Sequence, residues 1–185
     1  GYSGVATFAN ADAAALIQKT ETQIGDSWND TEGRILITKT GLFDLYNIYF
    51  PSGTTGEERQ TVKYAFLEAV FAYFQSLPKH DREKAIVCGD FNICHKDIDI
   101  HHPREAERRQ LSGFLPEERA WMDRFASLGF VDSFRAIHGD IPHQYSWWTY
   151  RAGARGKNLG WRIDYIFLGS ALAPHLVEAN ILATV

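Results

Sequence analysis

Apolar residues along the chain fall into short runs and alternating stretches that predict strands, separated by longer segments with helical spacing. Strand-like patterns cover residues 4–8, 34–38, 42–50, 84–93, 144–150, 160–168 and 181–185. The second and third of these segments flank Thr40-Gly41, so we expect them to pair antiparallel. Helices interrupt the strands, which favours two layers of sheet flanked by helices.

Two helices are predicted from apolar residues at helical spacing. The first covers about 55–77, and Thr55 stands three residues before Glu58, a spacing that predicts a capping box. The second begins at Pro116, which two glutamates follow, because proline and acidic residues suit the first turn of a helix. Gly129 supplies a natural end for this second helix.

The strand predicted at 84–93 ends in polar residues. Its apolar run leads into Gly89, which suits a place where another backbone comes close, and then into Asp90 and Asn92. Residues two apart in a strand project to the same side, so these two side chains should point together. They offer oxygens to a hard cation such as Mg²⁺ and an amide donor to a phosphate. The alternative is a strand end that turns into an Asx-stabilised loop.

Two further polar residues stand in apolar strands. Tyr49 ends the segment 42–50 and is either a packed tyrosine with a satisfied hydroxyl or a reactive group at a strand end. Asp164 lies within 160–168, where an unpaired carboxylate would be costly. Arg162 shares its face by alternation and is the structural partner that we expect. The functional alternative is that Asp164 orients a histidine acting as general base or phosphate ligand.

The segment 141–163 contains basic and aromatic residues but no aspartate or glutamate. Cations between aromatic faces predict a cradle for phosphates and an unstacked base or sugar, whereas the alternative is a solvated loop over a tryptophan core. The residues concerned are Trp147, Trp148, Tyr150, Arg151, Arg155, Lys157, Trp161 and Arg162. A second basic run at 104–109 is diluted by glutamates and suits a salt-bridged surface equally well.

Histidines and aspartates alternate at positions 95–101, within a stretch that we expect to be a polar loop. Ile98 and Ile100 would point the other way, and transition-metal ligands need a closed geometry. The alternation therefore favours a polar face over a metal site.

Composition narrows the classes of function. The chain has 185 residues, which suits a single domain over 1–185 with a substantial core. A net charge of −4 means that a nucleic-acid partner would be bound by a local patch. Cys88 and Cys94 fit neither a disulfide framework nor a zinc site, which favours a reducing, intracellular setting. No signal peptide or membrane-length apolar run is apparent.

Six segments, in order, resemble the exonuclease III family of apurinic/apyrimidinic endonucleases, within the endonuclease/exonuclease/phosphatase superfamily. They are 49–53, 89–92, 97–99, 112–119, 131–135 and 160–165, and the resemblance extends over the whole chain. The Gly-Asp-x-Asn segment is shared with the wider superfamily. Phe-Leu-Pro-Glu-Glu-Arg and Gly-Trp-Arg-Ile-Asp-Tyr are much more particular to the DNA-repair branch.

The resemblance implies a four-layer α/β sandwich of two packed, mainly antiparallel sheets flanked by helices. It implies Mg²⁺-dependent cleavage of the DNA backbone 5′ to an abasic site, with Mn²⁺ as a substitute, and trimming of 3′ ends by 3′–5′ exonuclease activity. The implied partner is double-stranded DNA with abasic sites or 3′ ends, and no membrane is involved.

The family's site residues map onto this chain position by position. By resemblance, Asp90 would activate the attacking water or protonate the leaving oxygen, and Asn92 would bind phosphate, both in the metal region. Tyr49 would contact the scissile phosphate or the metal region, and Asp164 would orient the catalytic histidine. The pocket for a flipped-out abasic sugar would comprise Trp147, Trp161 and Ile163, with Arg151, Arg155 and Lys157 on the DNA.

Two parts of the family pattern are missing from the sequence. The family begins with a strand carrying an asparagine and then a metal-binding glutamate, and it ends with a Ser-Asp-His piece that supplies the catalytic histidine. We therefore expect a middle portion, without the first strand–helix region and last strand, that is inactive alone and exposes edges favouring self-association. The alternatives are a truncated DNA-binding module without catalysis, or a phosphodiesterase acting on a phospholipid or inositol phosphate headgroup. Segments 112–119 and 160–165 argue against the last.

Overall fold

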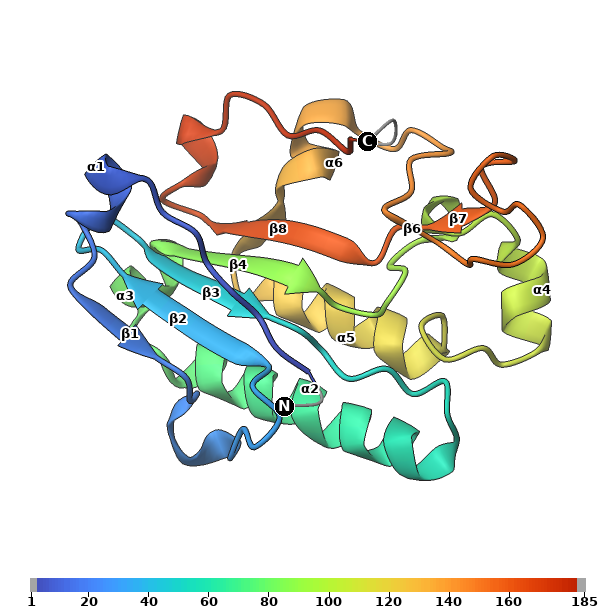
Figure 1. The fold of residues 1–185 in the computed structure, drawn as a ribbon, viewed down its shortest axis with the longest axis horizontal. Coiled ribbons are helices and arrows are strands. Elements are labelled where there is room, and N and C mark those ends of the chain that lie inside the picture. Colours follow the sequence, from blue (N-terminus) through green and yellow to red (C-terminus); the bar gives the residue numbers. More distant parts are fainter. Residues whose placement is uncertain (1–2, 183–185) are drawn as a thin grey trace.

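The computed structural model describes residues 3–182, which form a six-stranded sheet with two long helices on one face (Figure 1). In sheet order the strands are β1 (Lys19–Glu21), β2 (Ile35–Lys39), β3 (Asp44–Ile48), β4 (Ala85–Asp90), β8 (Asp164–Gly169) and β5 (Phe130–Asp132). Neighbouring strands are antiparallel except β3 and β4, which are parallel. A small second sheet pairs β6 (Trp147–Trp148) with β7 (Gly160–Trp161).

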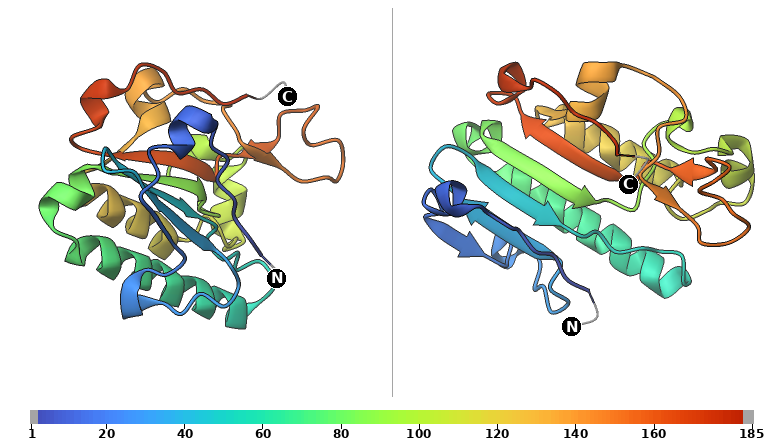
Figure 2. Two further views of the ribbon diagram at one scale, coloured as in Figure 1. Left: turned by 60° about the vertical axis from the view of Figure 1, so that its left-hand side comes forward. Right: turned by 45° about the horizontal axis from the view of Figure 1, so that its top comes forward.

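The helices differ widely in length. They are α1 (Ala11–Ala14), α2 (Glu57–Ser76), α3 (Lys79–Glu83), α4 (Pro103–Arg108), α5 (Pro116–Ser127) and α6 (Ser133–His138). Short 3₁₀ turns occupy η1 (Gly25–Ser27), η2 (Asp97–Asp99) and η3 (Ala173–His175). Helices α2 and α5 cover one face of the sheet, and the N-terminal segment crosses the other (Figure 2), where Asn47 Nδ2 donates to Ala6 O at 3.0 Å.

The core lies between the sheet and the two long helices. Alternate strand residues point toward these helices, namely Ile35, Ile37, Tyr46, Ile48, Val87, Tyr165 and Phe167. Aromatic side chains fill the layer: the rings of Phe50 and Phe91 stack at 4.3 Å and those of Trp121 and Phe125 at 5.1 Å. Burying each such large apolar side chain contributes about 1.5–3 kcal/mol, so this one face stabilises the fold.

The predicted α/β class is confirmed, as are the strands β2, β3, β4 and β8 and the two long helices. Within the described residues there is one large sheet, so the second packed sheet of the implied four-layer sandwich is not among them. The sheet face opposite α2 remains partly open to solvent, and Ile166 on it is 51% exposed.

Several local predictions are wrong. Residues 4–8 form no strand, and Phe8 is 95% exposed, because the alternation there has no partner strand to pack on. The predicted strand 144–150 is reduced to β6, and 181–185 lies largely outside the described residues, with no strand at 181–182. The expected capping box at Thr55 is absent. The N-cap of α2 is Gly56, which has no side chain to accept a hydrogen bond from the first turn.

The stretch around 95–101, predicted as a polar loop, contains η2, and α4 follows it. No described helix has the length and apolar character needed to cross a bilayer.

Candidate active site

Two carboxylates face each other where β4 ends and β8 begins. Asp90 and Asp164 are directly paired in the antiparallel register, on the sheet face away from α2 and α5. Burial and, after it, the neighbouring charge of Asp164 together raise the pKa of Asp90 to about 7. Partial desolvation also raises the pKa of Asp164, although a hydrogen bond from Ser146 opposes this. The pair can therefore hold a proton near neutral pH and exchange it.

Asn92 is tied to Asp90 by a tight turn. The Asn92 backbone N–H donates to Asp90 Oδ1 at 2.8 Å, and Asn92 Nδ2 donates to Asp90 Oδ2 at 3.2 Å and to Phe50 O at 2.9 Å. Asn92 itself has a left-handed backbone with φ of 54°. The predicted Asx-stabilised loop is thus present, and it leaves the amide oxygen without a hydrogen bond from the described residues.

Tyr49 lies beside this turn because β3 is parallel to β4. Phe50 N donates to Asp90 O at 2.8 Å, which carries the strand pairing past the end of β3. The half-buried Tyr49 ring has the Arg34 guanidinium 4.8 Å above it, and Arg34 Nη1 donates to Tyr49 O at 3.1 Å. By strand alternation Tyr49 shares the sheet face of Asp90. The buried Arg34 was missed from sequence.

Gly89 occupies the close approach that its position predicts. Its φ is 136°, and a Cβ placed there would lie 2.1 Å from Ile48 O on β3. Only glycine fits this contact without moving the backbone of one strand.

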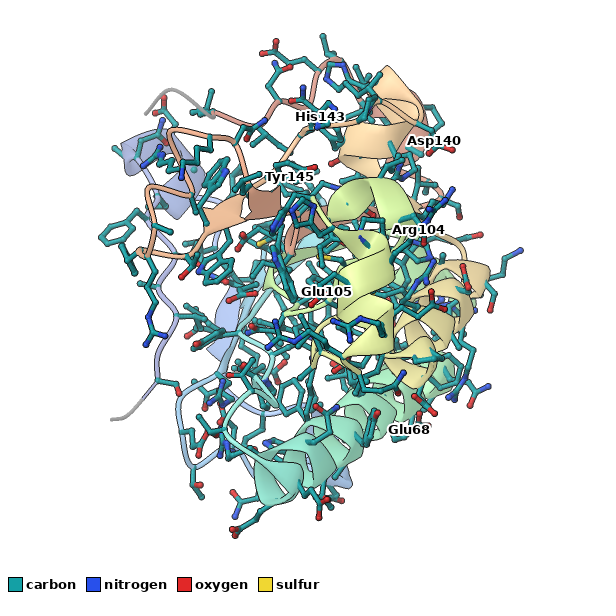
Figure 3. All side chains as sticks on the ribbon, turned by 90° about the vertical axis from the view of Figure 1, so that its right-hand side faces the viewer. Glu68, Arg104, Glu105, Asp140, His143 and Tyr145 are labelled. Carbon is teal, nitrogen blue, oxygen red and sulfur yellow. The ribbon has the colours of Figure 1, made fainter. Side chains whose placement is uncertain are left out.

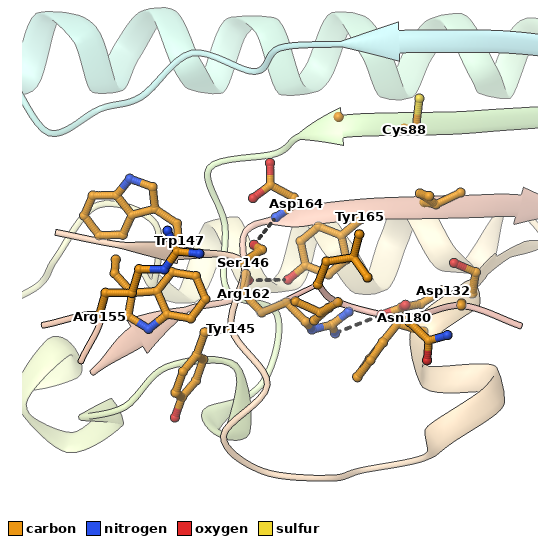
Figure 4. A pocket seen from close by; sticks show the side chains of 18 of the residues that line it. Cys88, Asp132, Tyr145, Ser146, Trp147, Arg155, Arg162, Asp164, Tyr165 and Asn180 are labelled. Atoms are coloured by element: carbon orange, nitrogen blue, oxygen red, sulfur yellow. Dashed lines mark hydrogen bonds and ion pairs between the residues drawn. The ribbon is translucent and has the colours of Figure 1, made fainter. Parts of the chain in front are cut away.

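A cavity of about 930 Å³ opens beside Asp164. Figure 4 shows Asp164, Ser146 and Trp147 along one part of it, with Tyr165, Arg162 and Asn180 nearby. The Ser146 hydroxyl accepts hydrogen bonds from the backbone N–H of Ile163 and of Asp164, both at 3.1 Å. These bonds fix the cavity wall against the start of β8.

Of the three residues expected to form an apolar pocket, one lines the cavity and two do not. Trp147 lines the cavity, and its ring meets that of Trp161 edge-on at 6.1 Å. Trp161 and Ile163 are not in the cavity wall, and Ile163 is buried with Cys94 in a second small core cluster. Ile163 is therefore a core residue, and its carbonyl accepts a hydrogen bond from Phe91 N at 2.8 Å, next to Asp90.

The basic residues of 151–157 lie on the long loop between β6 and β7. Arg151 is exposed, the Arg155 guanidinium lies 5.3 Å from the Trp148 ring centre, and Lys157 Nζ donates to Ala152 O at 3.0 Å. Of these cations Arg155 lines the cavity. The other basic run lies on α4 (Figure 3), where Arg108 pairs with Glu105 at 2.8 Å, so that run is a salt-bridged surface.

The expected pairing of Arg162 with Asp164 is wrong. Arg162 Nε bonds Asp99 Oδ1 at 2.8 Å, and Arg162 Nη2 lies 2.9 Å from Asp132 Oδ2. Residue 162 precedes β8, so strand alternation does not apply to it. Asp99 also pairs with Arg135 at 2.7 Å, and both Asp99 and Ile100 are buried, so the predicted alternation over 95–101 fails as well.

Sequence reasoning also missed a buried ion pair between Lys63 and Glu118, whose atoms Nζ and Oε1 are 2.5 Å apart. A signal was present: Lys63 falls on the apolar face of α2 with Phe66, Leu67 and Val70. A lysine at such a position must find a buried partner.

The oxygen atoms at this strand end can bind a hard cation together with waters and substrate phosphates. No group of three or more histidines, cysteines or acids able to hold a metal occurs in residues 3–182. Asp90, Asp164 and the amide oxygen of Asn92 nevertheless lie at one strand end. Mg²⁺ is commonly bound by one or two carboxylates together with waters and substrate phosphates, so this donor set fits it.

Comparison with known proteins identifies the family. The sequence matches the Endonuclease/Exonuclease/phosphatase family over residues 1–185. The chain belongs to this family. The resemblance seen in the sequence motifs is thereby confirmed.

Members of the family similar to the chain include DNA-processing proteins. The Bacillus subtilis (strain 168) "Exodeoxyribonuclease" is 37% identical over 185 residues, which cover 100% of this chain and 70% of that protein. The Danio rerio "DNA repair nuclease APEX1" is 35% identical, with 98% of this chain and 56% of that protein covered. The solved "AP Endonuclease from Archaeoglobus fulgidus" superposes with a TM-score of 0.70 at 30% identity, covering 80% of this chain and 57% of that one. The chain thus spans between about half and 70% of these relatives.

Proposed function

We propose that the chain belongs to a Mg²⁺-dependent DNA-repair phosphodiesterase that cleaves the backbone 5′ to abasic sites and trims 3′ ends. The single observation that supports it best is the facing pair Asp90 and Asp164, with Asn92 and Tyr49 at the same strand ends and a cavity alongside. The family membership and the names of the relatives support the same reaction class.

The proposed chemistry uses proton transfer at Asp90. A carboxyl whose pKa is about 7 can accept a proton from an attacking water or deliver one to the leaving oxygen near neutral pH. The Asn92 amide nitrogen already donates to Asp90 and to Phe50 O, so Asn92 would act on the phosphate through its amide oxygen and a bound cation. The Tyr49 hydroxyl lies on the same sheet face and would contact the phosphate. Asp164 is the residue that would orient a histidine, the role that the family resemblance assigns to it.

Asp90 and the Asn92 amide oxygen are the groups that would hold Mg²⁺. The cation would neutralise the phosphate and stabilise the leaving oxygen. Mn²⁺, which takes the same oxygen ligands, would substitute.

The cavity is the proposed place for an extruded abasic sugar. Trp147 on its wall supplies apolar surface, and an abasic nucleotide is easier to extrude than a normal one because it has no base to unstack. The adjoining loop would contact DNA backbone phosphates through its cations Arg151, Arg155 and Lys157.

The test uses the protein that contains this chain, Mg²⁺, and a DNA duplex with one tetrahydrofuran abasic analogue. We expect a single nick on the 5′ side of the analogue, and Asp90→Ala should lower the nicking rate at least about 100-fold while duplex binding changes little. The exposed Asp12→Ala on α1 is the control and should nick at the wild-type rate.

Salt-sensitive binding without any nicking would contradict the proposal and favour a DNA-binding module without catalysis. Normal nicking by Asp90→Ala would show that the role assigned to this carboxylate is wrong.

A further inference from the structure

A fully buried ion pair joins α2 to α5 next to the turn formed by residues 90–92. The side chains of Lys63 and Glu118 are both 0% exposed, and Lys63 Nζ lies 2.5 Å from Glu118 Oε1. Neither residue lines the cavity or belongs to the site described above.

The lysine has a second acceptor in the candidate site. Lys63 Nζ donates to the backbone carbonyl of Asn92 at 2.8 Å. Asn92 has φ of 54°, a conformation that residues other than glycine adopt uncommonly. A charged donor on its carbonyl fixes the peptide that leaves this residue, and with it the direction of the Asn92 side chain.

The glutamate fixes the 112–115 segment, which packs close to the same carbonyl. Glu118 Oε2 accepts from the backbone N–H of Gly113 at 2.6 Å and of Leu115 at 3.0 Å. Gly113 lies against the turn so closely that a Cβ there would be 3.1 Å from Asn92 O. The ion pair thus connects two helices and the 112–115 segment to one peptide of the site.

Joining α2 to α5 does not by itself require charges. Removing two charged groups from water is costly, and apolar side chains of similar volume often hold two helices together as well or better. The contribution that apolar side chains cannot replace is the directional hydrogen bond to Asn92 O.

We propose that Lys63 and Glu118 are positioning residues, which set the orientation of Asn92 and the 90–92 turn toward the phosphate without touching the substrate. The inference rests on the phosphodiester cleavage proposed above, since that reaction needs Asn92 and Asp90 in a fixed relation.

The kinetic test compares two double variants that bear no buried charge. Lys63→Met/Glu118→Gln keeps an acceptor for Gly113 and Leu115 but removes the donor to Asn92. Lys63→Gln/Glu118→Gln restores an amide donor. On the abasic duplex we expect the first to lower kcat about 30- to 100-fold with little change in KM, because small misplacements of reacting groups are costly. The second should recover part of the loss.

Val70→Ala is the matched control, because it removes buried apolar volume from the same helix without altering a hydrogen bond to the turn. It should lower stability and leave kcat unchanged. An equal loss of kcat in Val70→Ala would overturn the proposal, since general loosening of α2 would then explain the effect.

A second readout does not depend on activity. In ¹H–¹⁵N spectra of this chain without DNA or metal, the Asn92 side-chain amide should shift in Lys63→Met/Glu118→Gln and not in Val70→Ala. If the wild-type protein fails to nick DNA, the proposed function fails while this measurement still decides the positioning role. Unchanged Asn92 signals in the Met variant would overturn it. Should that variant not fold, Lys63→Leu/Glu118→Gln, which also removes the donor to Asn92 O, provides the same comparison.

Discussion

Among single residues, Asp90 has the clearest electrostatic signature. Its carboxylate is desolvated at the end of β4 and faces a second acid, so its pKa rises from 3.8 to about 7. A group of this kind is destabilising once it is ionised. The folded protein retains the proton over a pH range in which the unfolded chain has already lost it.

The sign of this effect gives a test by pH. The measurement is made in buffer that contains a metal chelator, so that no bound cation alters the ionisation of Asp90. The contribution of Asp90 to the free energy of unfolding is fully present below about pH 4 and is lost as the pH rises to about 7. Asp90→Asn removes this dependence, so the variant should gain stability relative to wild type across that interval. Urea unfolding followed by tryptophan fluorescence measures it, with exposed Asp12→Asn as the control. Parallel curves for wild type and Asp90→Asn would show that Asp90 ionises normally.

Gly89 allows a second test on one residue. A Cβ at Gly89 would lie 2.1 Å from Ile48 O, whereas one at Gly129 would have no atom within 4 Å, although both residues have positive φ. Gly129→Ala should cost about 1–2 kcal/mol from backbone strain alone. Gly89→Ala should cost clearly more, because it also forces β3 and β4 apart. Chemical denaturation compares them, and equal losses would refute the steric argument.

Secondary-structure elements were predictable where apolar spacing alone defines them. Residues of α2 and α5 bury a face at helical spacing, and β2, β3, β4 and β8 bury alternate residues or apolar runs, so sequence located all six. Elements β5 and α6 have three and six residues, and their place depends on ion pairs such as Arg135 with Asp99. Such partners are distant in sequence. For the same reason Arg162 was expected to pair with the nearby Asp164 and not with Asp99 and Asp132.

The candidate site was predictable to a similar extent. The strand-end position of Tyr49 and Asp90 follows from pattern. Asp164 was expected within a strand and instead begins β8, where the structure brings it together with Asp90. Lys63 had a signal as a lysine on an apolar helix face, but its partners, like those of Arg34 and Ser146, could not be predicted. A hydrogen bond between residues 15 to 29 apart leaves no local pattern in the sequence.

The Arg162 network joins three elements, η2, β5 and, through Arg135, α6, and predicts a large effect on stability. Arg162 is 2% exposed and contacts Asp99 from η2 and Asp132 from β5. Arg162→Met leaves these carboxylates buried with fewer partners, so it should cost about 3 kcal/mol or more. Arg124→Met, which breaks an exposed pair with Glu68, should cost about 0–1 kcal/mol. Thermal and urea unfolding give both values, and similar losses would argue against a structural network.

On the scale of the whole molecule, charge is unevenly distributed. The chain has a net charge of −4, whereas the loop after β6 has cations and no acids. Binding of DNA to such a molecule must be local and sensitive to salt.

Salt titration tests which cations make phosphate contacts. Arg151→Ala should weaken duplex binding and reduce the slope of log affinity against log salt by about 1. Arg124→Ala, on α5 and paired with Glu68, should leave the slope unchanged. Fluorescence anisotropy with a labelled duplex measures both. A loss of slope for Arg124 and none for Arg151 would place the DNA on another face.

The parallel pairing of β3 with β4 has a consequence for the order in which the molecule is completed. The chain from β3 through α2 and α3 to β4 already places Tyr49 beside Asp90, whereas Asp164 comes with β8, far later in synthesis. A nascent chain therefore acquires its first acid long before the second, and any partly folded form in which β8 has not docked has no carboxylate pair at all.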